Sequence, residues 1–386
     1  MKRVSVIFGS VVALGLGASS GVAQLPDLVD PPAPEVHLGR LLFWDPVLSG
    51  EQDVSCATCH HPDFAWADGR ELSLGPDASG LGPDRRAHSD SRIPVVKRNA
   101  PTILNTVYNG FGRRRGRRGR TGASPLNQAA APMFWDNRTA SLEAQALEPI
   151  KAFEEMRGFT YPEDVAVDSV LARLRTVPEY VRLFDEAFGD RGIQSETLGE
   201  AIASYQRTLV AADSPWDRFQ QGDVSALSAQ QQRGMREFDA VGCDRCHRGP
   251  MFSDFQLHAE GVKENPLLAE PDTSRGRYRF RTPTLRNVAL TAPYMHNGML
   301  SSLEDVLAFY DNGRSENPNV ASGGGRGRGG GASPSLDRDF RRVADMTERQ
   351  MDDIVAFLHA LTDEHFDRTV PERVPSGLTP GGDIGR

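Results

Sequence analysis

The chain carries the same five-residue cysteine–histidine motif twice, and this repeat constrains its fold more than any other feature. Residues 56–60 read CATCH and residues 243–247 read CDRCH. Two thiols three positions apart can bond to the two vinyl groups of one haem, and the next histidine can then bind the iron. The chain is therefore expected to wrap two covalently attached c-type haems. The attachment residues are Cys56, Cys59, Cys243 and Cys246, and the expected iron ligands are His60 and His247.

Two other interpretations of these cysteines are open at this point. A redox-active dithiol needs no histidine after its second cysteine, and a zinc site would have to bring together ligands from both motifs. The two motifs use all four cysteines of the chain, so no thiol remains for a separate disulfide. Haem attachment accounts for the cysteines and the histidines together.

The chain begins with a segment typical of secretory signal peptides. Lys2 and Arg3 precede an apolar stretch over residues 4–17, and the small residues Gly21 and Ala23 fit a cleavage site. An uncleaved anchor is the alternative, but the stretch is short for a membrane span. The net charge of −8 argues against nucleic acid as a partner. We expect a signal peptide over residues 1–23 and a periplasmic protein with no stable membrane insertion after cleavage.

An internal duplication surrounds the two motifs. Residues 101–105 (PTILN) match 283–287 (PTLRN), and the Ser-Leu-Glu of 141–143 recurs at 302–304. Helical patterns with Pro- and Gly-rich connections, and no sustained strand alternation, predict a mainly α fold of two cytochrome-c-like domains. The expected division is a first haem domain over 24–220 with an Arg-rich insertion at 111–131, a second over 221–370 with a Gly/Arg-rich loop at 321–334, and a tail over 371–386.

The duplication predicts that the two haems differ in their sixth iron ligand. When the repeats are aligned on Ser-Leu-Glu, Tyr310 occupies the position that Pro149 occupies in the first repeat. Proline cannot bind iron, so the first haem is expected to be open and the second to have a possible tyrosine ligand. Alternatively, Tyr310 is a core aromatic residue.

Acidic residues follow Pro149 closely. Glu155 is a candidate general base for peroxide, although Glu154 and Glu155 also fit a solvated surface pair. Trp135 is either an electron relay between the haems or a core residue.

The chain resembles the bacterial di-haem cytochrome c peroxidases, and within them the MauG-like branch, from about residue 38 to residue 361. The motifs that carry the resemblance are the two haem motifs, RNAPT at 98–102, FWD at 134–136, and TPTLRN at 282–287 followed by TAPY at 291–294. The resemblance implies that hydrogen peroxide is reduced at the first haem, where Gln145 and Glu155 line the pocket. It also implies that electrons arrive from a donor protein such as a small cytochrome c through the second haem and Trp135.

The resemblance further implies a calcium ion between the domains, bound by Asn99, Thr291 and Pro293. Two departures from the family pattern stand out. Tyr310 replaces a methionine, as in MauG-like members, and Ser91 replaces a distal histidine, which leaves nearby His88 as a candidate ligand of the first haem.

Two other functions fit the same residues. One is MauG-like, peroxide-driven oxidation of residues in a partner protein. The other is a non-catalytic electron-transfer cytochrome, in which both irons would be six-coordinate.

Overall fold

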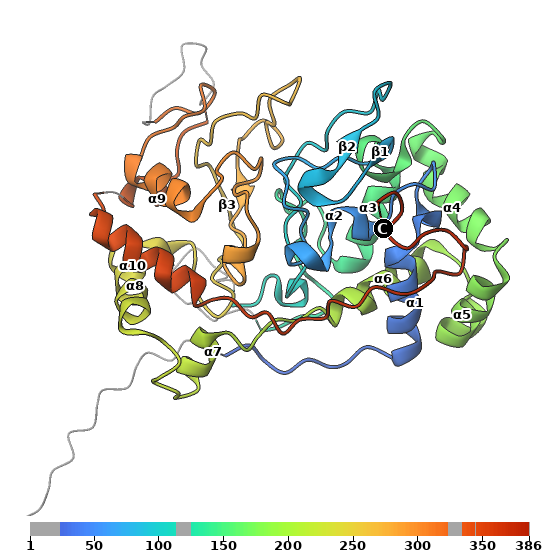
Figure 1. Cartoon of the computed structure of the whole chain (residues 1–386), viewed down its shortest axis with the longest axis horizontal. Coiled ribbons are helices and arrows are strands. Elements are labelled where there is room, and N and C mark those ends of the chain that lie inside the picture. The colour runs from blue at the N-terminus through green and yellow to red at the C-terminus, as the bar shows by residue number, and fades with distance from the viewer. Residues whose placement is uncertain (1–23, 113–124, 323–333, 344, 386) are drawn as a thin grey trace, which may run out of the picture.

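The protein folds into two mainly helical lobes, as predicted (Figure 1). The computed structural model describes residues 24–112, 125–322, 334–343 and 345–385. The predicted signal peptide, the arginine run at 113–120 and most of the Gly/Arg run lie outside these ranges. Within the described ranges, no helix has both the length and the apolar character that a membrane crossing needs.

Helices α1–α6 belong to one lobe and α8–α10 to the other, and the short α7 lies below α8 and α10, where its Trp216 joins the second hydrophobic core (Figure 1). The described residues contain two short antiparallel strand pairs, one in each lobe. The helices are α1 (Ala33–Trp44), α2 (Cys56–Cys59), α3 (Leu142–Lys151), α4 (Ala166–Leu174), α5 (Pro178–Phe188), α6 (Ser195–Arg207), α7 (Pro215–Gln220), α8 (Ala229–Ala240), α9 (Leu303–Asn312) and α10 (Glu348–His359). The strands are β1 (Ala78–Ser79), β2 (Arg86–Ala87), β3 (Leu257–His258) and β4 (Phe280–Arg281).

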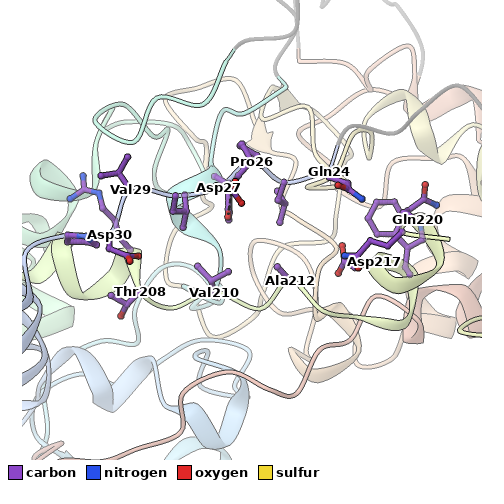
Figure 2. A pocket seen from close by; sticks show the side chains of 17 residues that line it. Gln24, Pro26, Asp27, Val29, Asp30, Thr208, Val210, Ala212, Asp217 and Gln220 are labelled. Carbon is purple, nitrogen blue, oxygen red and sulfur yellow. Dashed lines mark hydrogen bonds between the residues drawn. The ribbon is translucent and has the colours of Figure 1, made fainter. Parts of the chain in front are cut away.

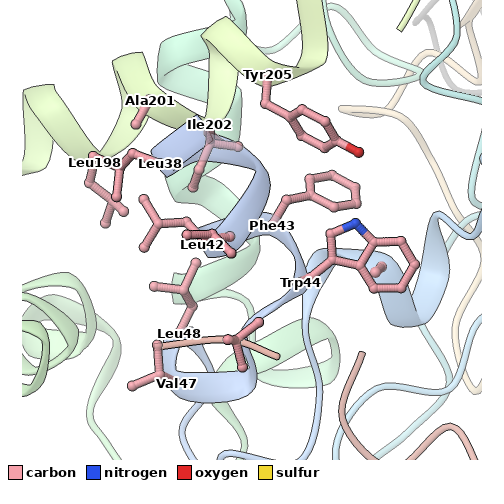
Figure 3. Close-up of a cluster of buried hydrophobic side chains, with 14 of the residues drawn as sticks. Leu38, Leu42, Phe43, Trp44, Val47, Leu48, Leu198, Ala201, Ile202 and Tyr205 are labelled. Carbon is pink, nitrogen blue, oxygen red and sulfur yellow. The ribbon is translucent and has the colours of Figure 1, made fainter. Parts of the chain in front are cut away.

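The core of the first lobe is built where α1 crosses α6. Leu38 and Leu42 of α1 pack against Ile202 of α6, and all three are fully buried (Figure 3). Gly39 allows the close approach, because a Cβ atom there would lie 1.8 Å from the carbonyl oxygen of Ala201. This core fixes the chain that leads into the first haem motif.

The second lobe repeats this device with α8 and α10. Gly234 of α8 lies against the backbone of α10, and a Cβ atom there would lie 1.7 Å from the carbonyl oxygen of Asp353. The N-terminus of α8 is capped by Ser228 and Gln231, as their capping-box spacing predicts. In both lobes, a glycine in the helix before the haem motif therefore allows that helix to pack closely against a second helix.

The duplication is also visible in the loops. Asn105 and Asn287 both adopt a left-handed conformation, with φ of 62° and 59°. Each side chain exchanges two hydrogen bonds with the backbone of a distant segment: Asn105 with Ala211, and Asn287 with Asp363. The alignment on Ser-Leu-Glu is correct in space, because Ser141 and Ser302 cap α3 and α9.

The C-terminal segment leaves the second lobe and runs back along the first (Figure 1). Phe366 and Val374 are part of the first hydrophobic core, and the Trp66 indole donates a hydrogen bond to the Asp367 carbonyl oxygen at 3.0 Å. Further on, the Gly381 carbonyl oxygen accepts a hydrogen bond from Thr58 within the first haem motif. The end of the chain thus helps to hold the motif of the first lobe.

Candidate active site

The first haem motif lies on α2 and presents a neutral imidazole. The His60 Nδ1 atom lies 3.2 Å from the carbonyl oxygen of Trp66, which leaves Nε2 as the ring atom that can bind a metal. Burial lowers the pKa of His60 to about 4, so the ring stays uncharged at neutral pH. This is the state that an iron ligand requires.

The two thiols of this motif also fit covalent haem attachment. Cys56 and Cys59 are not joined in a disulfide, and both line one cavity with His60. Burial raises the pKa of each thiol to about 12, so both are protonated at neutral pH. The donor set and the cavity together suit a haem held by two thioethers and one imidazole.

This cavity of about 310 Å³ brings together the residues that the sequence singled out for peroxide chemistry. Gln145 and Pro149 of α3 reach it from one helix, and Glu155 follows directly after that helix. The predicted positions therefore share one space with the haem motif. The lining includes Cys56, Cys59, His60, Arg98, Asn99, Pro101, Trp135, Arg138, Gln145, Pro149, Glu154, Glu155 and Arg281.

Glu155 is carried by a single π-helical turn, Phe153–Arg157, in which the Ala152 carbonyl oxygen accepts three backbone hydrogen bonds. Single π-helical turns are rare in proteins, and many of those that occur lie at functional sites. The turn is clamped between two glycines that flank the haem motif. A Cβ atom would lie 2.0 Å from the Arg157 carbonyl oxygen at Gly50, and 2.1 Å from that of Glu154 at Gly75. No sequence pattern indicates these two contacts.

The Glu155 carboxyl group has a strongly perturbed acidity. Burial and, to a smaller extent, the neighbouring Glu154 raise its pKa to about 7, although Arg138 acts in the opposite direction. A carboxyl group with a pKa near neutral pH can both accept and return a proton.

Trp135 lies where the two lobes meet. Its indole donates a hydrogen bond to the Asn99 carbonyl oxygen at 2.9 Å, and its own carbonyl oxygen accepts one from the Arg281 amide at 2.6 Å. Arg98 adds an ion-pair bridge, because its guanidinium contacts both Asp136 and Asp272. A tryptophan at this boundary is placed for either role that the sequence suggests.

The second motif follows the same plan. The His247 Nδ1 atom lies 2.9 Å from the Phe252 carbonyl oxygen, and burial lowers the pKa of this histidine too. Tyr310 of α9 and Cys243 pack against the same hydrophobic core, and the thiols of Cys243 and Cys246 are near enough to contribute to the raised pKa of Tyr310. The position of Tyr310 therefore fits a residue that faces the second haem.

The Tyr310 hydroxyl group donates a hydrogen bond to Glu260 at 2.8 Å. Burial and this carboxylate raise the pKa of the phenol well above 10. Glu260 was not among the residues that the sequence analysis selected, since it lies fifty positions before Tyr310 and belongs to no motif.

A zinc site that joins the two motifs is not supported by the geometry. In the described part of the chain, one group of three potential ligands lies close enough for a metal: Cys246, Asp254 and His258. This group takes nothing from the first motif. His258 also lies between two carboxylates, with each ring nitrogen 3.0 Å from Asp254 or Asp337, and these raise its pKa to about 12.

Two of the three predicted calcium ligands meet at the lobe boundary. The Asn99 amide lies 3.4 Å from the Pro293 carbonyl oxygen and 2.8 Å from that of Arg70. Thr291 precedes Pro293 by two positions, and its hydroxyl group donates to Val288.

His88 is placed differently from the other candidates. Its side chain is 44% exposed beside Asp77 and is not among the residues that line the haem cavity.

A larger cavity of about 600 Å³ lies elsewhere, between the N-terminal segment 24–31 and the connection from α6 to α7 (Figure 2). Val210, Ala212 and Asp217 are among its lining residues, and none of the predicted haem, catalytic or calcium residues is. We therefore place the chemistry in the smaller cavity.

The fold and the two motifs define a two-haem c-type oxidoreductase. The di-haem cytochrome c peroxidase family model matches residues 33–225, and the chain belongs to this family. Members of this family carry two haems, as the two motifs predict, and the assignment of the four cysteines as the attachment residues stays a prediction.

Individual relatives agree with this assignment. The chain is 35% identical to the methylamine utilization protein MauG of Methylorubrum extorquens over 351 residues, covering 89% of this chain and 82% of the relative. It is 33% identical to the cytochrome c551 peroxidase of Pseudomonas aeruginosa over 289 residues, covering 72% and 71%. A crystal structure of a MauG-like protein associated with microbial copper homeostasis superimposes with a TM-score of 0.64 at 26% identity, covering 92% of this chain and 96% of that one.

Proposed function

We propose that this protein is a periplasmic di-haem peroxidase that reduces hydrogen peroxide in the first-lobe cavity with electrons from a donor protein. The observation that carries the proposal is the content of that cavity, where Gln145, Pro149 and Glu155 share one space with His60. The second lobe offers Tyr310 at the position of Pro149. This inequivalence argues against the third possibility, a pure electron carrier, because a carrier gains nothing from an open iron.

When bound in the cavity, the haem supplies the iron at which the peroxide O–O bond is broken. Glu155 accepts a proton from one peroxide oxygen and returns it to the other, which then leaves as water. The Gln145 amide holds the peroxide by hydrogen bonding. The overall change consumes two electrons and two protons and releases two water molecules, and the electrons pass between the lobes by way of Trp135.

A second candidate function is peroxide-driven oxidation of residues in a partner protein. Tyr310 favours it, since an anionic phenolate ligand stabilises ferric or higher states of iron, whereas methionine stabilises the reduced state. The relative named as the methylamine utilization protein MauG is consistent with this candidate.

Two finer assignments belong to the same proposal. Calcium would be bound at the lobe boundary by Asn99, Thr291 and Pro293, where carbonyl and amide oxygens suit this cation. Export to the periplasm would follow from the signal-like sequence of residues 1–23.

A peroxide titration tests the proposal. One equivalent of hydrogen peroxide is added to the all-ferric, calcium-loaded protein, and the Soret and near-infrared absorption are followed by stopped flow. Rapid change without reductant supports the tyrosine-ligated, MauG-like function. Reaction only after one haem is reduced supports the donor-fed peroxidase, and no reaction in either state would leave an electron carrier.

A further inference from the structure

We propose that Glu260 is a positioning residue that holds the Tyr310 phenol toward the second haem and so determines the axial ligand of that haem. The inference rests on the second candidate function above, in which Tyr310 binds the second iron. It adds a residue to which neither the sequence motifs nor the comparisons assign a role.

The contact between the two side chains is direct. The Tyr310 hydroxyl oxygen lies 2.8 Å from the Glu260 Oε1 atom, which is an ordinary distance for a hydrogen bond between two oxygen atoms. A tyrosine side chain has two rotatable bonds before its ring, so a fixed acceptor at the hydroxyl group selects one orientation of the whole side chain. The carboxylate therefore fixes where the phenol oxygen lies. When the phenol binds iron as a phenolate, its proton passes to the Glu260 carboxylate, so one hydrogen bond still joins the two oxygens.

The backbone beside Glu260 is itself held in place. Gly261 has a φ of 69°, which an L-residue rarely adopts, and its carbonyl oxygen accepts hydrogen bonds from the amides of Glu316 at 2.8 Å and Asn317 at 2.9 Å. These amides belong to the loop that directly follows α9, the helix that carries Tyr310. The segment that carries Glu260 is therefore hydrogen-bonded to the loop that follows α9, and α9 carries Tyr310.

The neighbouring His258 does not compete for this role. Each of its ring nitrogens already lies 3.0 Å from a carboxylate oxygen, one of Asp254 and one of Asp337. It has no free nitrogen with which to accept a hydrogen bond from Tyr310. In the described part of the chain, Glu260 is the side chain that accepts a hydrogen bond from this phenol.

The test compares variants of the full di-haem protein. Glu260→Leu removes the acceptor, Glu260→Gln keeps an amide oxygen in its place, and Tyr310→Phe gives the spectrum without a phenol ligand. Phenolate-to-iron charge transfer in visible absorption and resonance Raman spectra of the ferric protein reports the ligand. We expect Glu260→Leu to lose this band as Tyr310→Phe does, and Glu260→Gln to retain it.

Glu264→Leu is the matched control. The Glu264 carboxylate accepts a hydrogen bond from the Asn317 side chain at 2.7 Å, so this variant loosens the same loop without touching Tyr310. It should keep the phenolate band. Glu260→Ala is measured in parallel, because it leaves a space and not a clash, and haem content and circular dichroism verify that each variant is folded.

Several outcomes would overturn the inference. They are absence of the band in the wild-type protein, its persistence in the folded Leu or Ala variant of Glu260, its loss in Glu260→Gln, and its loss in Glu264→Leu. The proposed function fails separately, when the first haem does not respond to peroxide in the wild-type protein in any redox state.

Discussion

At the scale of single residues, the surroundings of Glu155 determine the acidity of its carboxyl group. The carboxyl group is enclosed by the haem cavity and lies beside a second carboxylate, and its pKa is raised to about 7. As the base in peroxide cleavage, it should be hard to replace. We expect Glu155→Gln to slow the reaction with peroxide by about 10²-fold or more, measured by stopped flow. An unchanged rate constant would remove Glu155 from the mechanism.

The same residue sets a pH dependence with a definite sign. A base must be deprotonated to accept a proton, so the rate constant should rise with pH through about 7 and level off above it. Glu154 raises the pKa of Glu155, so Glu154→Gln should move the rising limb of the pH–rate profile to lower pH. The rate constant on the plateau at high pH should not change. In Glu155→Gln the limb should disappear. A limb that stays in Glu155→Gln would belong to another group.

At the scale of secondary-structure elements, the glycine-mediated helix crossings give a prediction on stability. A Cβ atom at Gly234 would meet the Asp353 carbonyl oxygen at 1.7 Å, so α8 and α10 would have to separate. Overpacking of this kind costs about 1–3 kcal/mol. Gly234→Ala should lower the urea midpoint followed by circular dichroism, while Arg236→Ala on the exposed side of α8 should shift it little. Equal midpoints for both variants would show that the close crossing is not needed.

Sequence reasoning succeeded for these elements where a local pattern determined the result. Ser141 and Ser302 cap α3 and α9, as the repeated Ser-Leu-Glu indicates, and this alignment brings Pro149 and Tyr310 to corresponding places. It missed the π-helical turn that carries Glu155, because that turn depends on contacts with Gly50 and Gly75, which lie 107 and 79 residues before the residues that they meet. Such contacts leave no periodic trace in the sequence.

At the scale of the whole molecule, long-range contacts were the least predictable. A tail over 371–386 was expected from composition, but nothing in the sequence indicated that the chain returns to the first lobe to meet Thr58 of the haem motif. The Arg98 bridge between Asp136 and Asp272 is similar, because its partners are separated by more than one hundred residues. Residues of this kind can be recognised in the sequence, but the sequence does not indicate which of them are in contact.

The lobe boundary carries the last prediction, on calcium. The backbone of Asn99 already joins the two lobes. Its backbone amide donates a hydrogen bond to the His296 carbonyl oxygen, and its backbone carbonyl oxygen accepts one from the Trp135 indole. A cation bound by its side chain would tighten this joint, and a ligand at a hundredfold excess over its Kd stabilises the folded state by about 2.7 kcal/mol. Chelation should therefore lower the melting temperature by a few degrees, and calorimetry should detect one calcium ion per chain.

Asn99→Ala keeps both backbone hydrogen bonds and removes the side-chain ligand, together with the side-chain hydrogen bonds to the Arg70 and Pro293 carbonyl oxygens. Its melting temperature should no longer respond to calcium. Asn137→Ala is the matched control, since the Asn137 side chain donates to the Phe255 carbonyl oxygen near the same boundary but does not belong to the proposed site. That variant should keep the full calcium response. If the chelator leaves the wild-type melting temperature unchanged, protein contacts alone hold the two lobes together. The same contacts would then keep Trp135 in place between the lobes.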